Sequence, residues 1–171
     1  MMKLYGARTI WRSESDDFLR WSEPEVILLP DLLDDADTEL YGMAAFQYSD
    51  MYIGMLERWL GNPDVIEVQL AWSHDGVQWL RPAVRRPFIG PTFPWNKGWS
   101  SCASTAPVRA GNQLWFYFGG RSGAHGREVP GSYGAVGLAT LTVDRYAAMS
   151  AGFKDGLLLT KPMTWPGGDL V

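Results

Sequence analysis

Two short segments of this 171-residue chain share the pattern Ser-x-Asp-x-x-x-Trp, and this repeat restricts the fold more than any other feature. The first runs from Ser15 to Trp21 and the second from Ser73 to Trp79, 58 residues later, with a weaker echo at 143–146. Ser and Asp side chains bind the backbone of tight turns, and the Trp is expected to fold under the turn as the next strand begins. Such units bury their apolar faces only against neighbouring units. The repeat therefore predicts successive β units packed side by side.

Alternating apolar residues between these turns predict short strands, whereas helical periodicity is poor along the whole chain. The clearest pattern is a hairpin over 39–48 and 51–59 whose turn is Ser49-Asp50. The other expected strands are 65–72, 77–83, 104–109, 113–118, 133–142 and a last strand near 156–161, preceded by half a unit in 4–12 and 19–29. We therefore expect an all-β fold of about two and a half four-stranded antiparallel sheets, each the size of a β-propeller blade.

Composition and charge exclude several classes of function. The chain has 15 Lys+Arg against 19 Asp+Glu, a net charge of −4, and so lacks the excess of basic residues that marks a general nucleic-acid-binding protein. One Cys and two His exclude an intrachain disulfide and an ordinary structural zinc site, and Cys102 is expected to be a small core residue. No apolar run approaches the ~18 residues that span a bilayer, and residues 1–10 lack the apolar core of a signal peptide. We expect no cofactor, no nucleic-acid or membrane partner, and a cytoplasmic rather than a secreted location.

The most unusual count is nine Trp beside seven Tyr and seven Phe. A flat indole stacks well on the C–H face of a pyranose ring, so this composition suits a sugar-binding protein. Most of these rings are also expected to pack in the core, as large aromatic side chains usually do. The composition therefore favours a carbohydrate ligand without naming the residues that bind it.

Taken in order, several segments resemble the five-bladed β-propeller glycoside hydrolases of families 32, 43, 62 and 68, and most closely a bacterial branch grouped with family 32. The resembling segments are 12–18, 21–25, 37–43, 68–76, 114–120, 124–126, 137–140, 144–146 and 160–162. The resemblance implies that 1–166 form the later blades of a propeller and that 167–171 begin a C-terminal β-sandwich. It also implies that the first blades, which carry the aspartate usually assigned as nucleophile or base, lie outside this sequence.

Asp37, Glu39 and Tyr41 are the best candidates for catalysis. Cleavage of a glycosidic bond usually takes two carboxyl groups, one that protonates the leaving oxygen and one that attacks the sugar or activates water. The three residues alternate at the start of the expected innermost strand, which puts them on one face. We expect Asp37 and Glu39 to be the catalytic pair and Tyr41 to contact substrate. The alternatives are a solvated acidic loop that continues from 31–35 and a calcium site in 34–39.

Two loops supply further candidates for substrate binding, Trp95 and Asn96 in the first and Arg121 and His125 in the second. Trp95 offers a stacking surface, and Asn96 stands where relatives commonly have Asp, so it suits a sugar hydroxyl but cannot act as acid or base. A neutral imidazole at His125 suits a sugar hydroxyl or the orientation of a carboxylate, and Arg121 suits a carboxylate-bearing sugar or an acidic side chain. Ordinary loop packing for Trp95 and a solvent-facing His125 are the alternatives, and no metal ligands are expected.

These features predict a carbohydrate-active protein, a glycoside hydrolase fragment that cleaves glycosidic bonds with an Asp/Glu pair at the propeller axis. The isolated chain is expected to be inactive, because half of the axial mouth would lie outside it. The alternative is a non-catalytic sugar-binding or scaffold propeller module that is completed by self-association through open blade edges. A second carboxylate about 5–9.5 Å from Asp37 or Glu39 would favour the hydrolase.

Overall fold

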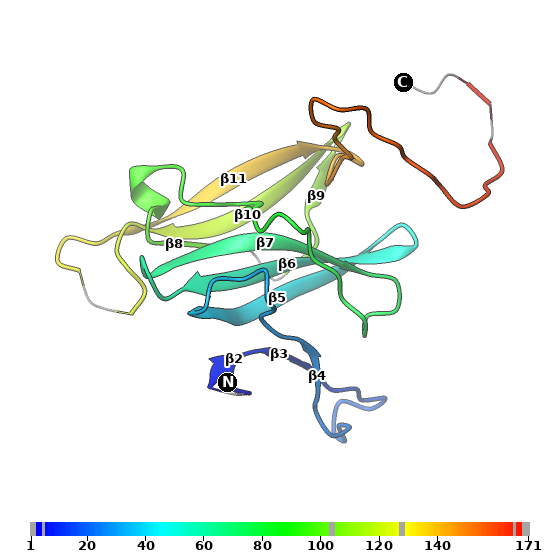
Figure 1. The fold of residues 1–171 in the computed structure, drawn as a ribbon. Coiled ribbons are helices and arrows are strands. Elements are labelled where there is room, and N and C mark those ends of the chain that lie inside the picture. Colours follow the sequence, from blue (N-terminus) through cyan, green and yellow to red (C-terminus); the bar gives the residue numbers. More distant parts are fainter. Residues whose placement is uncertain (1–2, 5, 103–104, 127–128, 166, 169–171) are drawn as a thin grey trace.

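The computed structural model describes residues 3–4, 6–102, 105–126, 129–165 and 167–168, and these residues form an all-β structure (Figure 1). In chain order the strands are β1 Lys3–Leu4, β2 Ala7–Arg8, β3 Ile10–Arg12, β4 Glu25–Leu28, β5 Thr38–Tyr48, β6 Met51–Leu60, β7 Val65–Ser73, β8 Trp99–Cys102, β9 Val108–Ala110, β10 Gln113–Arg121 and β11 Gly134–Thr142. One 3₁₀ turn, η1 Pro94–Asn96, precedes β8, and the described residues contain no α-helix. Within them, no helix has the length and apolar character needed to cross a membrane. The predicted all-β class is confirmed.

Seven strands form one curled sheet in the order β11-β10-β8-β7-β6-β5, with β9 paired to the start of β10. Neighbours are antiparallel except β7 and β8, which run parallel and pair only at Ile66 and Trp99. The predicted hairpin is confirmed, since β5 and β6 turn at Ser49-Asp50 and Ser49 adopts a φ of 55°. The two larger predicted units therefore join at one pair of residues instead of forming separate sheets.

The two faces of β5–β7 pack against different neighbours, because side chains alternate along each strand. On one face, Met55 and Val68 belong to an apolar core that they share with Phe116 of β10. On the other face, Leu40 and Leu56 pack against apolar side chains of β3 and β4. Figure 1 shows β3 and β4 below the strands β5–β7, and β10 and β11, where the same sheet curls over, above them. Because each fully buried Leu or Phe contributes about 1.5–3 kcal/mol, both contacts hold the central hairpin in place.

The two Ser-x-Asp turns have the same hydrogen bonding, as the sequence repeat predicts. In each, the Asp carboxylate accepts the backbone N–H groups two and three residues ahead, at 2.8 and 2.7 Å for Asp75 and at 2.8 Å for both in Asp17. The Ser two residues earlier donates its hydroxyl to the same carboxylate. Trp79 folds under the second turn and donates its indole N–H to the Gly76 carbonyl at 3.0 Å. Trp21 packs edge-to-face on Phe18 of the first turn and remains 54% exposed.

Two predicted strands of the central units are shorter than expected. Segment 77–83 contributes only a bridge from Leu80 to Trp72, because Pro82 lacks the N–H that a longer ladder needs. The predicted four-stranded meander therefore has three strands and this bridge. Segment 104–109 is represented by β9 alone, and its first residue lies outside the described part of the chain. The N-terminal half unit likewise forms only the short hairpins β1–β2 and β3–β4.

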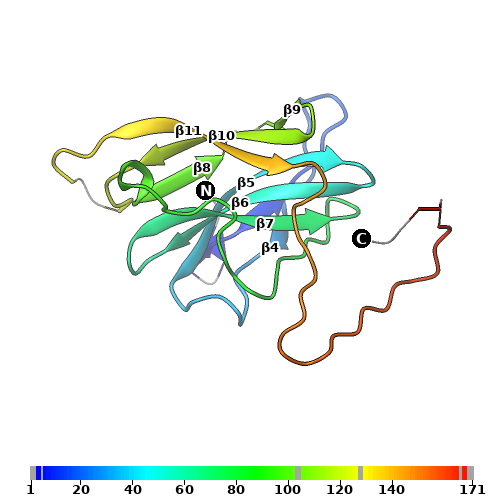
Figure 2. The ribbon, with the colours of Figure 1, turned by 90° about the horizontal axis from the view of Figure 1, so that it is seen from above.

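The strand predicted near 156–161 is not formed. The described residues of this tail are exposed and without regular structure, and Figure 2 shows the segment after β11 running away from the sheet. An extended segment becomes a strand only when a neighbour accepts its hydrogen bonds, and none of the described strands does so here. The boundary between 1–166 and 167–171 stays a prediction, because residues 166 and 169–171 lie outside the described residues.

Candidate functional site

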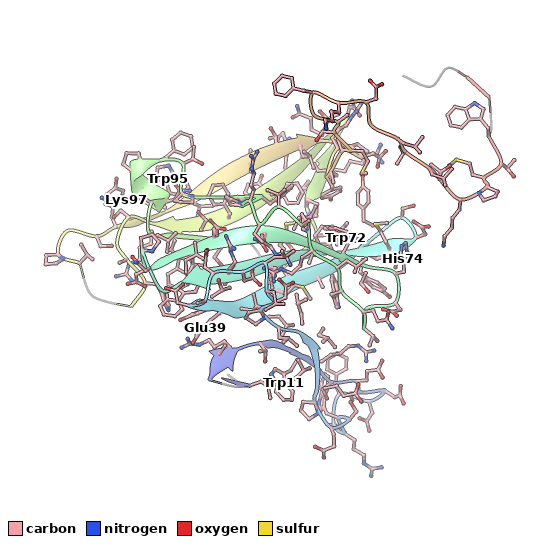
Figure 3. All side chains as sticks on the ribbon, in the orientation of Figure 1. Trp11, Glu39, Trp72, His74, Trp95 and Lys97 are labelled. Atoms are coloured by element: carbon pink, nitrogen blue, oxygen red, sulfur yellow. The ribbon has the colours of Figure 1, made fainter. Side chains whose placement is uncertain are left out.

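Carboxylates and aromatic rings gather at the end of the sheet where β5 begins and β6 ends. We call this group the end cluster, and its members are Arg8, Glu39, Tyr41, Glu57, Trp59, Trp99, Ser101 and His125. Figure 3 shows Glu39 and the η1 residue Trp95 at this end of the molecule, and His74 at the opposite end. The end cluster therefore brings together residues from strands and loops that are far apart in the sequence.

The register of β5 and β6 places two glutamates on one face of the hairpin. Glu39 pairs with Trp59, and Glu57 lies two residues before Trp59 on the same strand. Alternation then points both carboxylates to the same side. Diagonal neighbours in an antiparallel pair lie about 7–8 Å apart. Gly42, which pairs with Glu57, carries no side chain, so space is left beside the Glu57 carboxyl group.

Tyr41 lies in a β-bulge, and its ring contacts Trp59 and His125 of the end cluster. The register passes from the Leu40–Arg58 pair to the Gly42–Glu57 pair, which leaves Tyr41 as the extra residue. Its ring centroid lies 4.8 Å from that of His125, in an edge-to-face arrangement. Burial raises the pKa of the Tyr41 phenol, so it remains a protonated hydrogen-bond donor at neutral pH.

Arg8 of β2 holds Glu39 in an ion pair. The side chains of Arg8 and Glu39 are 25% and 12% exposed, so the pair is partly screened from water. The Arg8 guanidinium also lies over the Tyr41 ring, 4.4 Å from its centroid, which is a cation–π contact. The Arg8 guanidinium therefore holds the Glu39 carboxyl group in place at the end cluster.

Glu57 is in the opposite electrostatic situation. Burial raises the pKa of the Glu57 carboxyl group, and the hydroxyl of Ser101, which donates to Glu57 Oε1, offsets part of that shift. A carboxyl group that keeps its proton to higher pH than an ordinary Glu suits a proton donor.

Cys102 follows Ser101 on β8. Burial, with the nearby Glu57 charge, raises the pKa of Cys102 to about 12, so this thiol is unreactive and packs on the apolar core.

Aromatic rings enclose His125. Besides Tyr41, the ring of Trp99 lies edge-on at 4.7 Å and that of Trp59 at 6.4 Å. Asp64 fixes the loop that carries this histidine, because its carboxylate accepts the backbone N–H of Gly126 at 2.9 Å. The imidazole Nδ1 is buried and has no hydrogen-bond partner among the described residues. His125 therefore faces the end cluster and not bulk solvent.

A cavity of about 340 Å³ opens beside the end cluster. Its lining residues are Trp99, Ser101, Gly119, Gly120, Arg121, Ser132, Tyr133 and Gly134. Trp99 and Ser101 connect the two features, since Trp99 contacts His125 and Ser101 contacts Glu57. The volume falls within the range of about 300–1,000 Å³ that small-molecule sites occupy.

Three of the predicted site residues are engaged in local structure. Asp37 lies one residue before β5 and accepts the backbone N–H of Asn62 at 2.6 Å. The ring of Trp95 stacks on Phe118 with centroids 5.4 Å apart. Asn96 is 1% exposed, and its amide makes hydrogen bonds of 2.8 to 3.0 Å with its own loop and the start of β8. The predicted residues that lie at the end cluster or its cavity are Glu39, Tyr41, Arg121 and His125.

The sequence reasoning missed Glu57, which the structure makes a central member of the cluster. A signal was present, because Glu57 and Arg58 interrupt an otherwise apolar strand, and a charge in a buried strand often marks a site. Trp59 and Trp99 were indistinguishable from core tryptophans, since ring type alone does not reveal which face of a strand is occupied.

The acidic stretch before β5 is paired with arginines. Arg81 donates to both oxygens of Asp34 at 2.6 Å, Arg85 pairs with Asp31, and Arg58 pairs with Glu67. These residues, Asp31, Asp34, Arg58, Glu67, Arg81 and Arg85, form the arginine cluster. Within the segment 34–39, where a calcium site was the alternative, Asp34 is therefore paired with Arg81 and Glu39 with Arg8. Among the described residues, no group of His, Cys, Asp and Glu is arranged to hold a metal ion.

No family model, curated protein or solved structure matches this chain. The resemblance to five-bladed glycoside hydrolases therefore stays a prediction. The function has to be argued from the geometry of the end cluster and its cavity.

Proposed function

We propose that this chain is a propeller-type carbohydrate-active protein whose end cluster hydrolyses glycosidic bonds. The observation that carries the proposal is the contrast between two carboxyl groups on one face of the β5–β6 hairpin. Glu57 has a pKa raised by burial, whereas Glu39 is ion-paired with Arg8. A glycosidase needs one protonated and one ionised carboxyl group flanking the scissile bond.

Glu57 and Glu39 would each perform one step of the cleavage. Glu57 donates its proton to the leaving oxygen, and Glu39 attacks the sugar or activates a water molecule. Their backbone positions, diagonal across the hairpin at about 7–8 Å, are compatible with the carboxyl separations of about 5–9.5 Å used by such enzymes. Glu57 replaces Asp37 as the partner of Glu39, because the Asp37 carboxylate already accepts the N–H of Asn62.

Aromatic rings would hold the sugar between these groups. Trp59, Trp99 and Tyr41 surround the end cluster, and His125 carries a polar Nδ1 without a partner among the described residues. Indole faces suit pyranose rings, and a neutral imidazole suits a sugar hydroxyl. The cavity beside Trp99 extends this surface beyond the two glutamates.

A propeller arrangement is supported by the repeated turn and by the stacking of layers. The hairpin β3–β4 and the strands β10–β11 pack on opposite faces of β5–β7 around two apolar cores, as neighbouring blades do, although one pair of residues joins β7 to β8 in a single sheet. One edge of β11 has no strand partner among the described residues, so self-association through this edge would extend the assembly. Measurement of the molecular mass in solution tests this self-association, and a monomer at all concentrations contradicts it.

Hydrolysis is tested with a panel of 4-nitrophenyl glycosides and three variants. Glu57→Gln and Glu39→Gln are expected to lower turnover by about 10²–10⁴-fold. The matched control is Glu25→Gln, since Glu25 is exposed on β4 and lies outside the end cluster. Turnover is expected from this chain itself, in contrast to the inactive fragment predicted from the sequence, because the end cluster holds both carboxyl groups. Turnover that survives Glu57→Gln unchanged, or absence of turnover with every glycoside, contradicts the proposal.

A second candidate is a sugar-binding module without catalysis. It is favoured by the aromatic enclosure of His125, which offers binding surface but no chemistry. In that case oligosaccharides bind without turnover, and Glu57→Gln leaves their affinity unchanged. Trp59→Ala then weakens binding, because a stacked ring contributes to affinity whether or not a bond is cleaved.

A further inference from the structure

Arg121 is a cation on the wall of the cavity that has no carboxylate partner among the described residues. Its Nε donates to Ser132 Oγ at 3.2 Å, which fixes the plane of the guanidinium group. The two terminal nitrogens have no hydrogen-bond partner in the described part of the chain. This contrasts with Arg58, Arg81 and Arg85, whose guanidinium groups all have carboxylate partners.

The rest of the cavity suits a sugar ring beside that cation. Trp99 supplies an aromatic wall, Ser101 and Ser132 supply hydroxyl groups, and Tyr133 lies at the rim with 55% of its surface exposed. Three glycines complete the lining and add no side chains to it. An aromatic wall, hydroxyl groups and one pre-oriented cation make a surface for a polar, ring-shaped ligand with a single negative charge.

We propose that this cavity binds a saccharide unit that carries a carboxylate, such as a uronic acid residue. The carboxylate accepts both terminal nitrogens of Arg121, because the planar guanidinium fork matches a planar carboxylate. The sugar ring lies against Trp99, and the linkage to the next unit points toward Ser101 and Glu57. This inference rests on the proposed function, since it places an acidic sugar next to the groups that would cleave its linkage.

Binding is measured by isothermal titration with matched probes. The probes are methyl β-D-glucuronide and methyl β-D-galacturonide, the corresponding neutral methyl glucoside and galactoside, glucose 6-sulfate, and sodium acetate. We expect at least one uronide to bind about tenfold or more tightly than its neutral partner, which is the size of a charge-assisted hydrogen-bonded contact. Salt weakens this preference, because part of it is electrostatic.

Three variants locate the carboxylate. Arg121→Gln is expected to abolish the preference for uronide, and Arg121→Lys to retain part of it, since a lysine supplies charge without the fork. Arg109→Gln is the matched control, because Arg109 is an exposed arginine bonded only to the carbonyl of its own turn. Circular dichroism and the melting temperature establish that each variant is folded. A folded Arg121→Gln protein that keeps the preference overturns the inference.

Each of the other possible outcomes also supports or overturns the inference. Equal affinity for uronides and neutral sugars, no binding of either, tighter binding of glucose 6-sulfate, or acetate binding as tightly as the uronides each overturns it. A uronide preference that depends on Arg121 supports the inference even if neither the wild type nor the variants Glu57→Gln and Glu39→Gln cleave any glycoside. Hydrolysis of neutral glycosides alone, lost in those two variants, supports the proposed function and overturns this inference.

Discussion

The indole N–H of Trp59 donates a hydrogen bond of 2.8 Å to the carboxylate of Asp64. The same carboxylate accepts the backbone N–H of Gly126, so one side chain joins the end of β6 to the loop that carries His125. Asp64 also has a φ of 69°, a left-handed conformation that Asp, Asn and Gly tolerate best. The position of His125 at the end cluster therefore depends on this one residue.

Asp64→Gly is expected to destabilise the protein and to loosen the His125 loop. Glycine keeps the left-handed backbone but removes the acceptor, and hydrogen bonds to a charged group are each worth about 1.5–3 kcal/mol. Urea unfolding measures the loss, and amide exchange at Gly126 reports the loop. Asp64→Asn, which keeps one acceptor oxygen, is the control with a smaller effect. Unchanged exchange at Gly126 in the glycine variant contradicts the assignment.

The chemistry of the turns could be predicted from the sequence because it is local. Asp75 and Asp17 bind backbone groups two and three residues away, so the spacing alone specifies the structure. Glu39 and His125 were also recognisable, one by its place at the start of an alternating strand and the other by its glycine-rich loop. Residues whose structure is decided by near neighbours in the chain could therefore be predicted from the sequence.

The rest of the site depends on contacts between distant segments. Glu57 acquires its Ser101 partner because β8 lies beside β7, with which it forms one parallel pair, Ile66 with Trp99. Strict alternation groups Tyr41 with Glu39, and the structure places them on one face, but alternation does not reveal that Tyr41 is the extra residue of a bulge. Neither the bulge nor a parallel contact across a long loop has a signature in hydrophobic periodicity.

Asp34→Ala is expected to lower the free energy of unfolding by about 3 kcal/mol or more, because it leaves the buried guanidinium group of Arg81 without a carboxylate partner. The side chains of Asp34 and Arg81 are 1% and 2% exposed, and the two form a pair of hydrogen bonds of 2.6 Å. Chemical denaturation measures the change. Glu25→Ala, at an exposed site on β4, is the control and is expected to have little effect. A loss in Asp34→Ala no larger than in the control contradicts the role of the arginine cluster.

The lowered pKa of Asp34 predicts a loss of stability in acid. Burial on its own raises the pKa of Asp34, but the hydrogen bonds and charge of Arg81 outweigh it and hold the pKa below its ordinary value of 3.8. The stabilisation is therefore fully present above that ordinary pKa and is lost as the pH falls through the lowered one. Unfolding measured between pH 5 and pH 2 is expected to show a larger loss in the wild type than in Asp34→Ala, because other carboxyl groups with lowered pKa values, such as Asp31, contribute equally to both proteins. Parallel curves for the two proteins contradict it.

Gly76→Ala is expected to cost about 1–2 kcal/mol through the backbone alone. Gly76 has a φ of +74°, and the nearest atom to an added Cβ would be a Tyr52 ring carbon at 3.7 Å, so no clash contributes. Phe18 has the equivalent position in the first turn with a φ of 59°, and Phe18→Gly is expected to relieve strain there. Gly152→Ala is the control, because that glycine has open space and no left-handed φ. Equal effects at Gly76 and Gly152 contradict the argument.

Glu57→Gln separates the electrostatic state of this carboxyl group from any catalytic role. Burial raises the pKa of Glu57 above its ordinary value of 4.5, so the folded protein holds this proton more tightly than the unfolded chain. The unfolded state then binds fewer protons, and stability falls as the pH rises from 4.5 through the higher folded pKa. Glutamine has similar shape and no charge, so the variant lacks this loss and is expected to be more stable than the wild type at pH 8 but not at pH 4. Urea unfolding across this range measures the difference, with Glu25→Gln as the exposed control. If the difference in the free energy of unfolding between wild type and variant does not change with pH, burial does not raise the pKa of Glu57. The proton-donor role proposed for Glu57 would then be contradicted.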